Sequence, residues 1–144
     1  MNRRDILHRS IYPAALTEVE KILATVEAVS EDRLTAKKCM QLQLAVEEAV
    51  VNIIHYAYVN VQGTAPVIEV TVWCSTESLH VEIVDFGNAY NPLETKDPIM
   101  SDQLEDRKVG GLGIYFIRQV VDGVQYQRVD QANRLVLMMK LENA

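Results

Sequence analysis

The spacing of apolar residues changes along this chain, and this change restricts the possible fold more than any other feature. In residues 14–29 and 33–58 apolar side chains recur at helical spacing, which predicts two amphipathic helices. Later segments instead alternate apolar and polar residues, which predicts strands with one buried face. These later segments are Val67–Cys74, Leu79–Asp85, Val124–Asp130 and Arg134–Leu141.

The predicted strands form two hairpins, because only a short polar connection separates the members of each pair. The first connection is Ser-Thr-Glu-Ser and the second is Gln-Ala-Asn. An edge strand at Ile6–Tyr12 and a third helix at Ile114–Val121 complete the order. This order lacks the strict strand–helix alternation of a parallel doubly wound sheet. It predicts an α/β fold of the two-layer α+β sandwich type, in which a mixed or antiparallel sheet carries its helices on one face.

Length and charge restrict the class of protein further. The chain has 144 residues, a length that favours a single domain over residues 1–144. Its formal net charge of −6 argues against nucleic-acid binding. No apolar run has the length of a bilayer span and no signal peptide is evident, so we expect a cytoplasmic protein that does not enter the membrane. Cys39 and Cys74 lack the spacing of a zinc or redox pair and are expected to be buried thiols.

One segment has no period at all. Residues 91–109 contain two prolines and many charges, but no regular repeat of apolar side chains. Structureless stretches of this length inside a compact domain are usually lids or disordered segments. We therefore expect a lid, which implies a ligand site beneath it.

A first candidate motif lies in the second predicted helix. Glu48 and Asn52 are four residues apart, so their side chains lie one turn apart on one face, which we place opposite the apolar stripe. A carboxylate there could orient a nucleophile while the amide oxygen binds Mg²⁺, a hard cation that takes oxygen ligands. The same spacing also fits a solvated helix face without function.

A second motif, Asp-Phe-Gly-Asn-Ala, follows a predicted strand at residues 85–89. Its first three residues also hold magnesium in eukaryotic-type protein kinases, but the H-R-D loop that those enzymes require does not occur here. At the end of a strand, the Asp85 carboxylate could accept a hydrogen bond from a planar ligand, with Gly87 and Ala89 leaving room for the ring. Alternatively, the stretch is a turn that needs Gly87 for its backbone angles.

A third motif, Lys-Val-Gly-Gly-Leu-Gly, precedes the third predicted helix at residues 108–113. Glycines before a helix let its free N–H groups converge on a phosphate, and Arg107 and Lys108 add positive charge. The motif is neither a P-loop nor a Rossmann fingerprint, since no G-K-[ST] follows and Phe116 replaces the last glycine. A flexible loop that enters an amphipathic helix fits it equally well.

In this order, a magnesium ligand with a candidate base, a ring acceptor and a phosphate cradle indicate a nucleotide site. The three motifs resemble those of the histidine-kinase-like ATPase superfamily, which includes gyrase, MutL and sensor kinases and whose architecture is called the Bergerat fold. Within it, the chain is most similar to the short anti-sigma-factor serine kinases of bacteria. The N box is matched by Glu48 and Asn52, the first glycine box by Asp85, Gly87 and Ala89, and the second by Gly110, Gly111, Leu112 and Gly113.

The resemblance implies a role for each matched residue. Asp85 would receive the adenine amino group, Asn52 would hold Mg²⁺ against the phosphates, and Glu48 would be the catalytic base. Gly87, Ala89, Arg107, Lys108 and the residues of the second glycine box would complete the ATP site. The chain departs from the family in two places: Tyr56 stands where members often carry His, and the last hairpin has no third glycine box.

Two functions fit this interpretation. The first is an ATP-dependent serine/threonine protein kinase that acts as an anti-sigma factor, phosphorylates a small antagonist protein and regulates transcription by partner switching. For this function the resemblance implies ATP and Mg²⁺ as cofactors, a sigma factor or similar regulator as a second partner, and a homodimer. The alternative is a nucleotide-gated switch that sequesters a regulatory protein without transferring phosphate. A third hypothesis is a domain that binds no ligand, in which the three motifs are only turns and a helix face.

Overall fold

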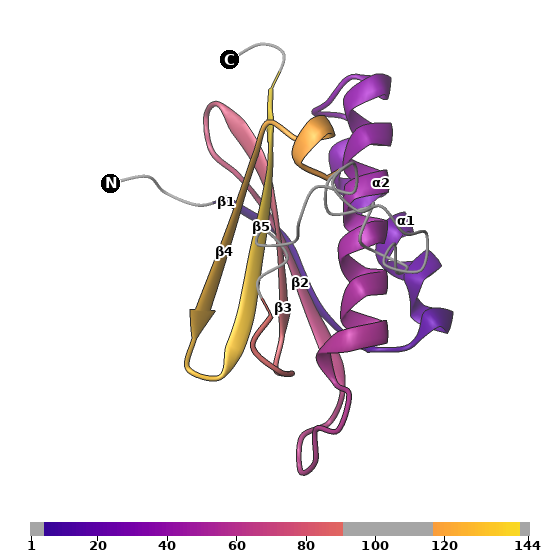
Figure 1. Cartoon of the computed structure of the whole chain (residues 1–144). Helices are drawn as coiled ribbons and strands as arrows, with labels where there is room; N and C mark the ends of the chain where they lie inside the picture. Colours follow the sequence, from indigo (N-terminus) through magenta and orange to yellow (C-terminus); the bar gives the residue numbers. More distant parts are fainter. Residues whose placement is uncertain (1–4, 91–116, 142–144) are drawn as a thin grey trace, which may run out of the picture.

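A single antiparallel sheet forms one layer of the structure, a computed structural model that describes residues 5–90 and 117–141. The sheet has five strands in the order β1-β2-β3-β5-β4, and each neighbouring pair is antiparallel. The strands are β1 (Asp5–Pro13), β2 (Val67–Cys74), β3 (Ser78–Asp85), β4 (Gly123–Val129) and β5 (Ala132–Lys140). Figure 1 shows the helices gathered on one face of this sheet. The predicted two-layer architecture and the edge strand are confirmed.

The helical layer consists mainly of two α-helices. Its elements are the 3-10 turn η1 (Leu16–Glu18), α1 (Val19–Ser30), α2 (Ala36–Asn52) and the π-helical turn η2 (Ile53–Ala57), which continues α2 without a break. Thr35 caps α2, since its side chain accepts a hydrogen bond from the Lys38 N–H at 3.2 Å. Residues 117–120 are also helical, and the rest of the predicted third helix before them lies outside the described residues.

The first helix begins later than its apolar spacing predicts. Pro13 is the last residue of β1, and the Ala14 N–H donates to the Pro66 carbonyl at 2.8 Å. Ala15 is still extended, with φ −140°, and the 3-10 turn then precedes the start of α1 at Val19. Hydrogen bonding to the chain that leads into β2 therefore delays the helix, a tertiary constraint that periodicity cannot report.

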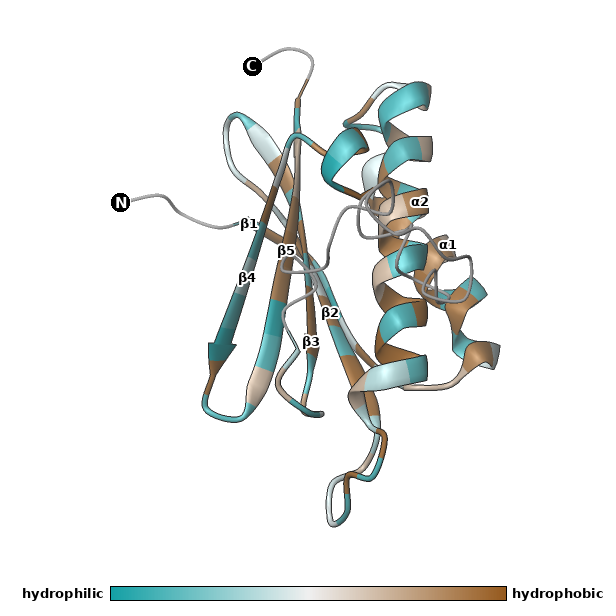
Figure 2. Cartoon of the chain, viewed as in Figure 1, coloured by the Kyte–Doolittle hydropathy of each residue, from teal (hydrophilic) through white to brown (hydrophobic). Residues whose placement is uncertain are grey.

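The core lies between the helices and the inner face of the sheet. Alternate residues of the central strands are buried there, among them Val70, Val81 and Leu137, and they pack in one cluster with Leu42 and Val46 of α2. Figure 2 shows the matching alternation of hydrophobic and hydrophilic residues along the strands. Within the described part of the chain, no helix combines the length and apolarity needed to cross a bilayer.

The thiols lie at the margin of this core. Cys39 and Cys74 are both free and both half-buried, rather than buried as expected. Cys39 packs against the core cluster from α2, and Cys74 does so from the end of β2.

The second hairpin has a shorter turn than predicted, and its last strand begins two residues earlier. Asp130 and Gln131 have positive φ values of 48° and 67°, and two such residues between strands make the tight turn that matches strand twist. The predicted Gln-Ala-Asn turn is therefore wrong, and β5 already begins at Ala132. As a result Asn133 becomes a strand residue, directly opposite Asp85 of β3.

Tyr58 fastens the end of η2 to two strands. Its hydroxyl donates to the Val67 carbonyl at the start of β2 and accepts from the Phe86 N–H at 2.9 Å, just beyond β3. The Val67 N–H also donates to this hydroxyl, at 3.3 Å. One side chain therefore fixes the distance between the helical layer and the sheet at the end where Asp85 lies.

Replacing Tyr58 with phenylalanine should lower the free energy of unfolding by about 1–3 kcal/mol, because backbone groups of two strands lose a hydrogen-bond partner. Urea unfolding followed by circular dichroism measures the change. Tyr12→Phe is the matched control, since the Tyr12 hydroxyl donates to one side chain, Thr25 Oγ1, at 3.0 Å. Loss of this hydrogen bond should lower the free energy of unfolding by about 0.5–1.5 kcal/mol. Equal effects of the two substitutions would contradict the anchoring role of Tyr58.

Candidate functional site

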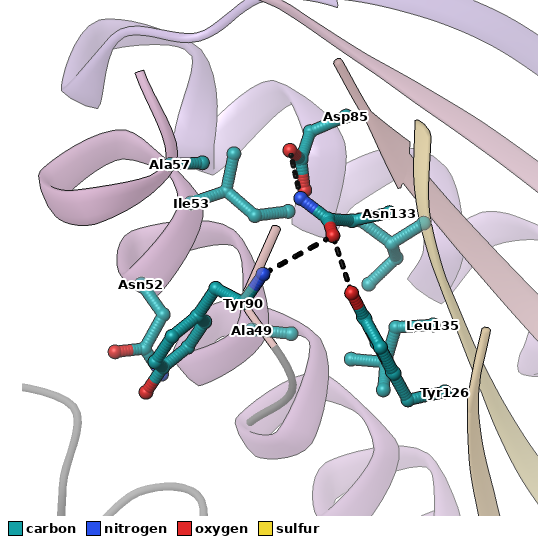
Figure 3. Close-up of a pocket in the computed structure, with 10 residues that line it drawn as sticks. Ala49, Asn52, Ile53, Ala57, Asp85, Tyr90, Tyr126, Asn133 and Leu135 are labelled. Atoms are coloured by element: carbon teal, nitrogen blue, oxygen red, sulfur yellow. Dashed lines mark hydrogen bonds between the residues drawn. The ribbon is translucent and has the colours of Figure 1, made fainter. Parts of the chain in front are cut away.

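A pocket opens between the C-terminal half of the α2–η2 helix and the sheet, as Figure 3 shows. The helix contributes Ala49, Asn52, Ile53 and Ala57, and the sheet and its loops contribute Ile83, Asp85, Tyr90, Tyr126, Asn133 and Leu135. Most of these side chains are apolar or aromatic, and hydrogen bonds join Asp85, Tyr90 and Tyr126 to Asn133. A concave, largely apolar pocket with a few fixed polar groups is typical of a small-molecule site.

Asp85 is a buried carboxylate at the end of β3, with 4% of its surface exposed. Its Oδ1 accepts two hydrogen bonds, from the Gly87 N–H at 3.0 Å and from Asn133 Nδ2 at 2.9 Å. No described residue donates to Oδ2, which leaves this oxygen available to a ligand. Burial raises the pKa of Asp85, although the hydrogen bonds from Asn133 and Gly87 and the charge of Arg128 act in the opposite direction.

Asn133 holds Asp85 in place and uses its whole amide to do so. Its Nδ2 donates to Asp85 Oδ1 and, at 2.7 Å, to the Asn88 carbonyl. Its Oδ1 accepts from the Tyr126 hydroxyl at 2.5 Å and from the Tyr90 N–H at 3.4 Å. Figure 3 shows the bonds to Asp85, Tyr126 and Tyr90. With two donors and two acceptor positions engaged, the amide is fully satisfied and its orientation is fixed.

The sequence interpretation missed Asn133, although a signal was present. Asn133 shares the inner face of β5 with Leu135, Leu137 and Met139, all of them buried. A polar residue that continues an apolar row is informative, because burying it requires hydrogen-bond partners. The signal was overlooked because the predicted Gln-Ala-Asn turn assigned Asn133 to the connection and not to the strand.

Gly87 is required by a close contact with the helix. A Cβ at this position would lie 2.2 Å from the Ala57 carbonyl oxygen, and the next residue, Asn88, donates its N–H to that oxygen at 2.7 Å. Gly87 is not among the described residues with positive φ, so the turn does not need glycine for its backbone angles. The expectation that Gly87 mainly leaves room for a ring is also revised, because the helix end occupies that space.

Asn52 lies on the buried side of α2, which corrects the predicted placement opposite the apolar stripe. Only 5% of its surface is exposed, and it lines the pocket together with Ala49 and Ile53. Seven residues before Asn52, two helical turns away, lies the fully buried Ala45, so Asn52 continues the inner row of the helix. Its Nδ2 is buried and has no hydrogen-bond partner among the described residues. An amide N–H donor without an internal partner, at a pocket wall, suits a ligand that accepts hydrogen bonds.

Glu48 lies one helical turn before Asn52 and is half-buried. Burial raises the pKa of its carboxyl, and the negative charge of neighbouring Glu47 raises it further. Glu47 itself is exposed. A carboxylate with a raised pKa accepts a proton more readily than an ordinary one, which is the property required of a general base.

The other predicted site residues either do not line the pocket or lie outside the described residues. Ala89 is exposed and is not among the residues that line the pocket. Tyr56 is half-buried, and its ring lies 6.0 Å from that of His55. Arg107, Lys108, Gly110, Gly111, Leu112 and Gly113 lie outside the described residues, as does the predicted lid. Within the described ranges, no group of three or more His, Cys, Asp or Glu side chains could hold a metal ion.

The unfilled space in the pocket is small. Its volume is about 30 Å³, room for roughly one or two water molecules. A planar base would therefore need the pocket to widen. Tyr90, 41% exposed, is the most exposed of the lining residues.

Replacing Asp85 with asparagine should leave the protein without nucleotide as stable as the original at pH 7, or more stable. The Oδ1 of asparagine can keep both internal hydrogen bonds, and the substitution removes a buried charge. A raised pKa means that Asp85 stabilises the fold below its unfolded pKa near 3.8 and that this contribution is lost as pH rises through the folded pKa. The free energy of unfolding, measured from pH 3 to 8, should therefore favour the variant increasingly with pH.

Asn133→Ala is the control for this comparison, because it removes the partner and leaves the buried charge. That variant should be destabilised by about 1–3 kcal/mol or more at pH 7. If Asp85→Asn were as destabilising as Asn133→Ala, ionised Asp85 would be a structural necessity rather than a stability cost.

Comparisons with known proteins agree with this fold. Residues 12–140 match the model of the histidine kinase-like ATPase domain. The serine/threonine-protein kinase BtrW of Bordetella bronchiseptica is 28% identical over 136 residues, which cover 94% of this chain and 93% of BtrW. A chain in the crystal structure of the SiaB–SiaC complex from Pseudomonas aeruginosa shares the fold, with a TM-score of 0.58, 13% identity, and coverage of 94% of this chain and 90% of that one. This chain therefore belongs to the histidine kinase-like ATPase domain family.

Proposed function

We propose that this protein is an ATP-dependent serine/threonine protein kinase that acts on a small protein partner. The observation that carries the proposal is the position of Glu48 and Asn52, one turn apart on α2, beside a pocket that contains the buried Asp85 carboxylate. The helix thus supplies a candidate base and an amide without an internal partner, and the buried carboxylate of Asp85 lies on the sheet side of the pocket. The similarity to a relative named as a serine/threonine-protein kinase supports this choice among the activities of the family.

In the proposed complex, Asp85 recognises adenine. Its Oδ2 has no donor among the described residues and would accept a hydrogen bond from the exocyclic amino group, while Asn133 and Gly87 keep Oδ1 occupied. A hydrogen bond to a charged acceptor contributes about 1.5–3 kcal/mol. The apolar side chains of Ala49, Ile53 and Ile83 would contact the faces of the base.

Glu48 would act on the acceptor hydroxyl. Its carboxylate takes the serine proton while the serine oxygen forms a bond to the γ-phosphorus, and the bond between that phosphorus and the bridging oxygen of ADP breaks. Mg²⁺, when bound, would neutralise phosphate charge, and Asn52, buried at the pocket wall, would offer its amide oxygen as a ligand. The second glycine box and its preceding basic residues, Arg107 and Lys108, would contribute phosphate contacts.

The proposed acceptor is a serine of a small antagonist protein. Phosphorylation of that protein would change which partner this chain holds, so that the kinase acts as an anti-sigma factor and regulates transcription by partner switching. One structure that shares this fold is that of a two-protein complex, which supports a protein partner in general. A sigma factor or similar regulator as the second partner, and a homodimer, complete the proposal.

Replacing Glu48 with glutamine should abolish phosphate transfer and leave ATP binding nearly unchanged, because glutamine has similar size but cannot accept the proton. The purified protein is incubated with γ-labelled ATP, Mg²⁺ and a lysate of the source organism, and ATP binding is measured separately. Label should appear at serine on one small protein with the original chain and be absent with the variant.

Glu47→Gln is the matched control on the next residue. It should retain transfer, and it should move the acid limb of the rate–pH profile to lower pH, because it removes one of the two causes that raise the Glu48 pKa. Normal transfer by Glu48→Gln would show that another group is the base. Binding of Mg-ATP by the original chain without any transferred label would favour the nucleotide-gated switch instead.

A further inference from the structure

Two exposed apolar side chains lie on α2 in line with Glu48. Met40 is 59% exposed and Leu44 is 41% exposed, and Met40, Leu44 and Glu48 follow one another at intervals of four residues. Residues four apart on a helix are neighbours on one face. The three side chains therefore form a row that leads along the helix surface to the candidate base.

This row is unusual for the outer side of an amphipathic helix. Single exposed apolar residues are common on protein surfaces, and what distinguishes this pair is its position on the row that ends at Glu48. Methionine is also frequent on surfaces that bind partners, because its flexible side chain adapts to different shapes. The core explains neither residue, since α2 packs against the sheet through Leu42, Val46 and other buried side chains.

The proposed reaction brings a protein surface to this row. With a rise of 1.5 Å per residue, Leu44 lies about 6 Å and Met40 about 12 Å along the helix axis from Glu48. A stable protein contact covers about 800 Å² on each partner, equivalent to a disc of roughly 16 Å radius. A folded protein whose serine is within hydrogen-bond reach of Glu48 therefore extends over Leu44 and Met40 if it is centred near the base.

We propose that Met40 and Leu44 form the docking surface for the protein that receives the phosphate, and that this protein presents apolar side chains beside its acceptor serine. The inference rests on the proposed kinase function. Exposed Glu47 lies next to the base, and its negative charge would repel acidic residues of the partner that lie close to the serine. The expected partner surface is thus apolar and not acidic.

The test is a double variant, Met40→Gln with Leu44→Gln, which keeps helix propensity and should leave the core intact. The probe is the acceptor protein labelled by the original chain, identified and produced alone. The variant should raise the KM for this acceptor about tenfold or more, leave kcat at saturating acceptor nearly unchanged, and bind Mg-ATP normally. Met40→Leu with Leu44→Met, which preserves the apolar surface, should restore the original KM.

Ile11→Gln is the matched control, because Ile11 is 62% exposed on β1 and pairs with Glu69 on the sheet face away from the helices. It should not change the KM for the acceptor.

An unchanged KM in the double variant would overturn the docking surface without contradicting the proposed kinase function. A change in sedimentation with an unchanged KM would overturn it too, and would assign the row to a second copy of this chain. If the original chain labels no protein, the docking proposal and the kinase function fail together.

Discussion

The hydrogen bond from Asn133 to Asp85 is the interaction on which the organisation of the site depends. It joins directly opposed residues of β3 and β5 inside the protein, where an unpaired carboxylate would be costly. Because the Asn133 amide is itself held by Tyr126 and Asn88, the Asp85 carboxylate has a fixed orientation before any ligand arrives. Pre-organisation of this kind favours recognition, since little reorganisation is needed on binding.

The helix and the strand end are brought together by a second constraint, the contact between Gly87 and Ala57. No side chain fits between the glycine and the Ala57 carbonyl, so the end of η2 rests directly on the turn after β3. The π-helical turn that ends at Ala57 follows Asn52 immediately, and π-helical turns are frequent at functional sites. The N box and the first glycine box thus lie on two walls of one pocket because of backbone packing, not because of a direct bond between their polar side chains.

The sequence predicted the element types and the antiparallel two-layer architecture, because alternation and helical spacing report which face of each element is buried. It predicted local details less well. The start of α1 depends on the hydrogen bond from Ala14 to Pro66, and the second hairpin turn depends on two residues with positive φ. Asn133 was missed for that reason, and the reason for Gly87 was misjudged, since a contact across 30 residues leaves no trace in local spacing.

The central claim is that Asp85 recognises the amino group of adenine, and nucleotide selectivity tests it most directly. Isothermal titration should compare Mg-ATP with Mg-ITP, which carry an amino group and a carbonyl, respectively, at the base position that would face Asp85. We predict that ATP binds roughly 10- to 150-fold more tightly, as expected for loss of one hydrogen bond to a charged group worth about 1.5–3 kcal/mol. Asp85→Asn, which can donate to the carbonyl, should reduce or reverse this preference. Equal affinity of the original chain for both nucleotides would contradict the assignment of Asp85 as the adenine acceptor.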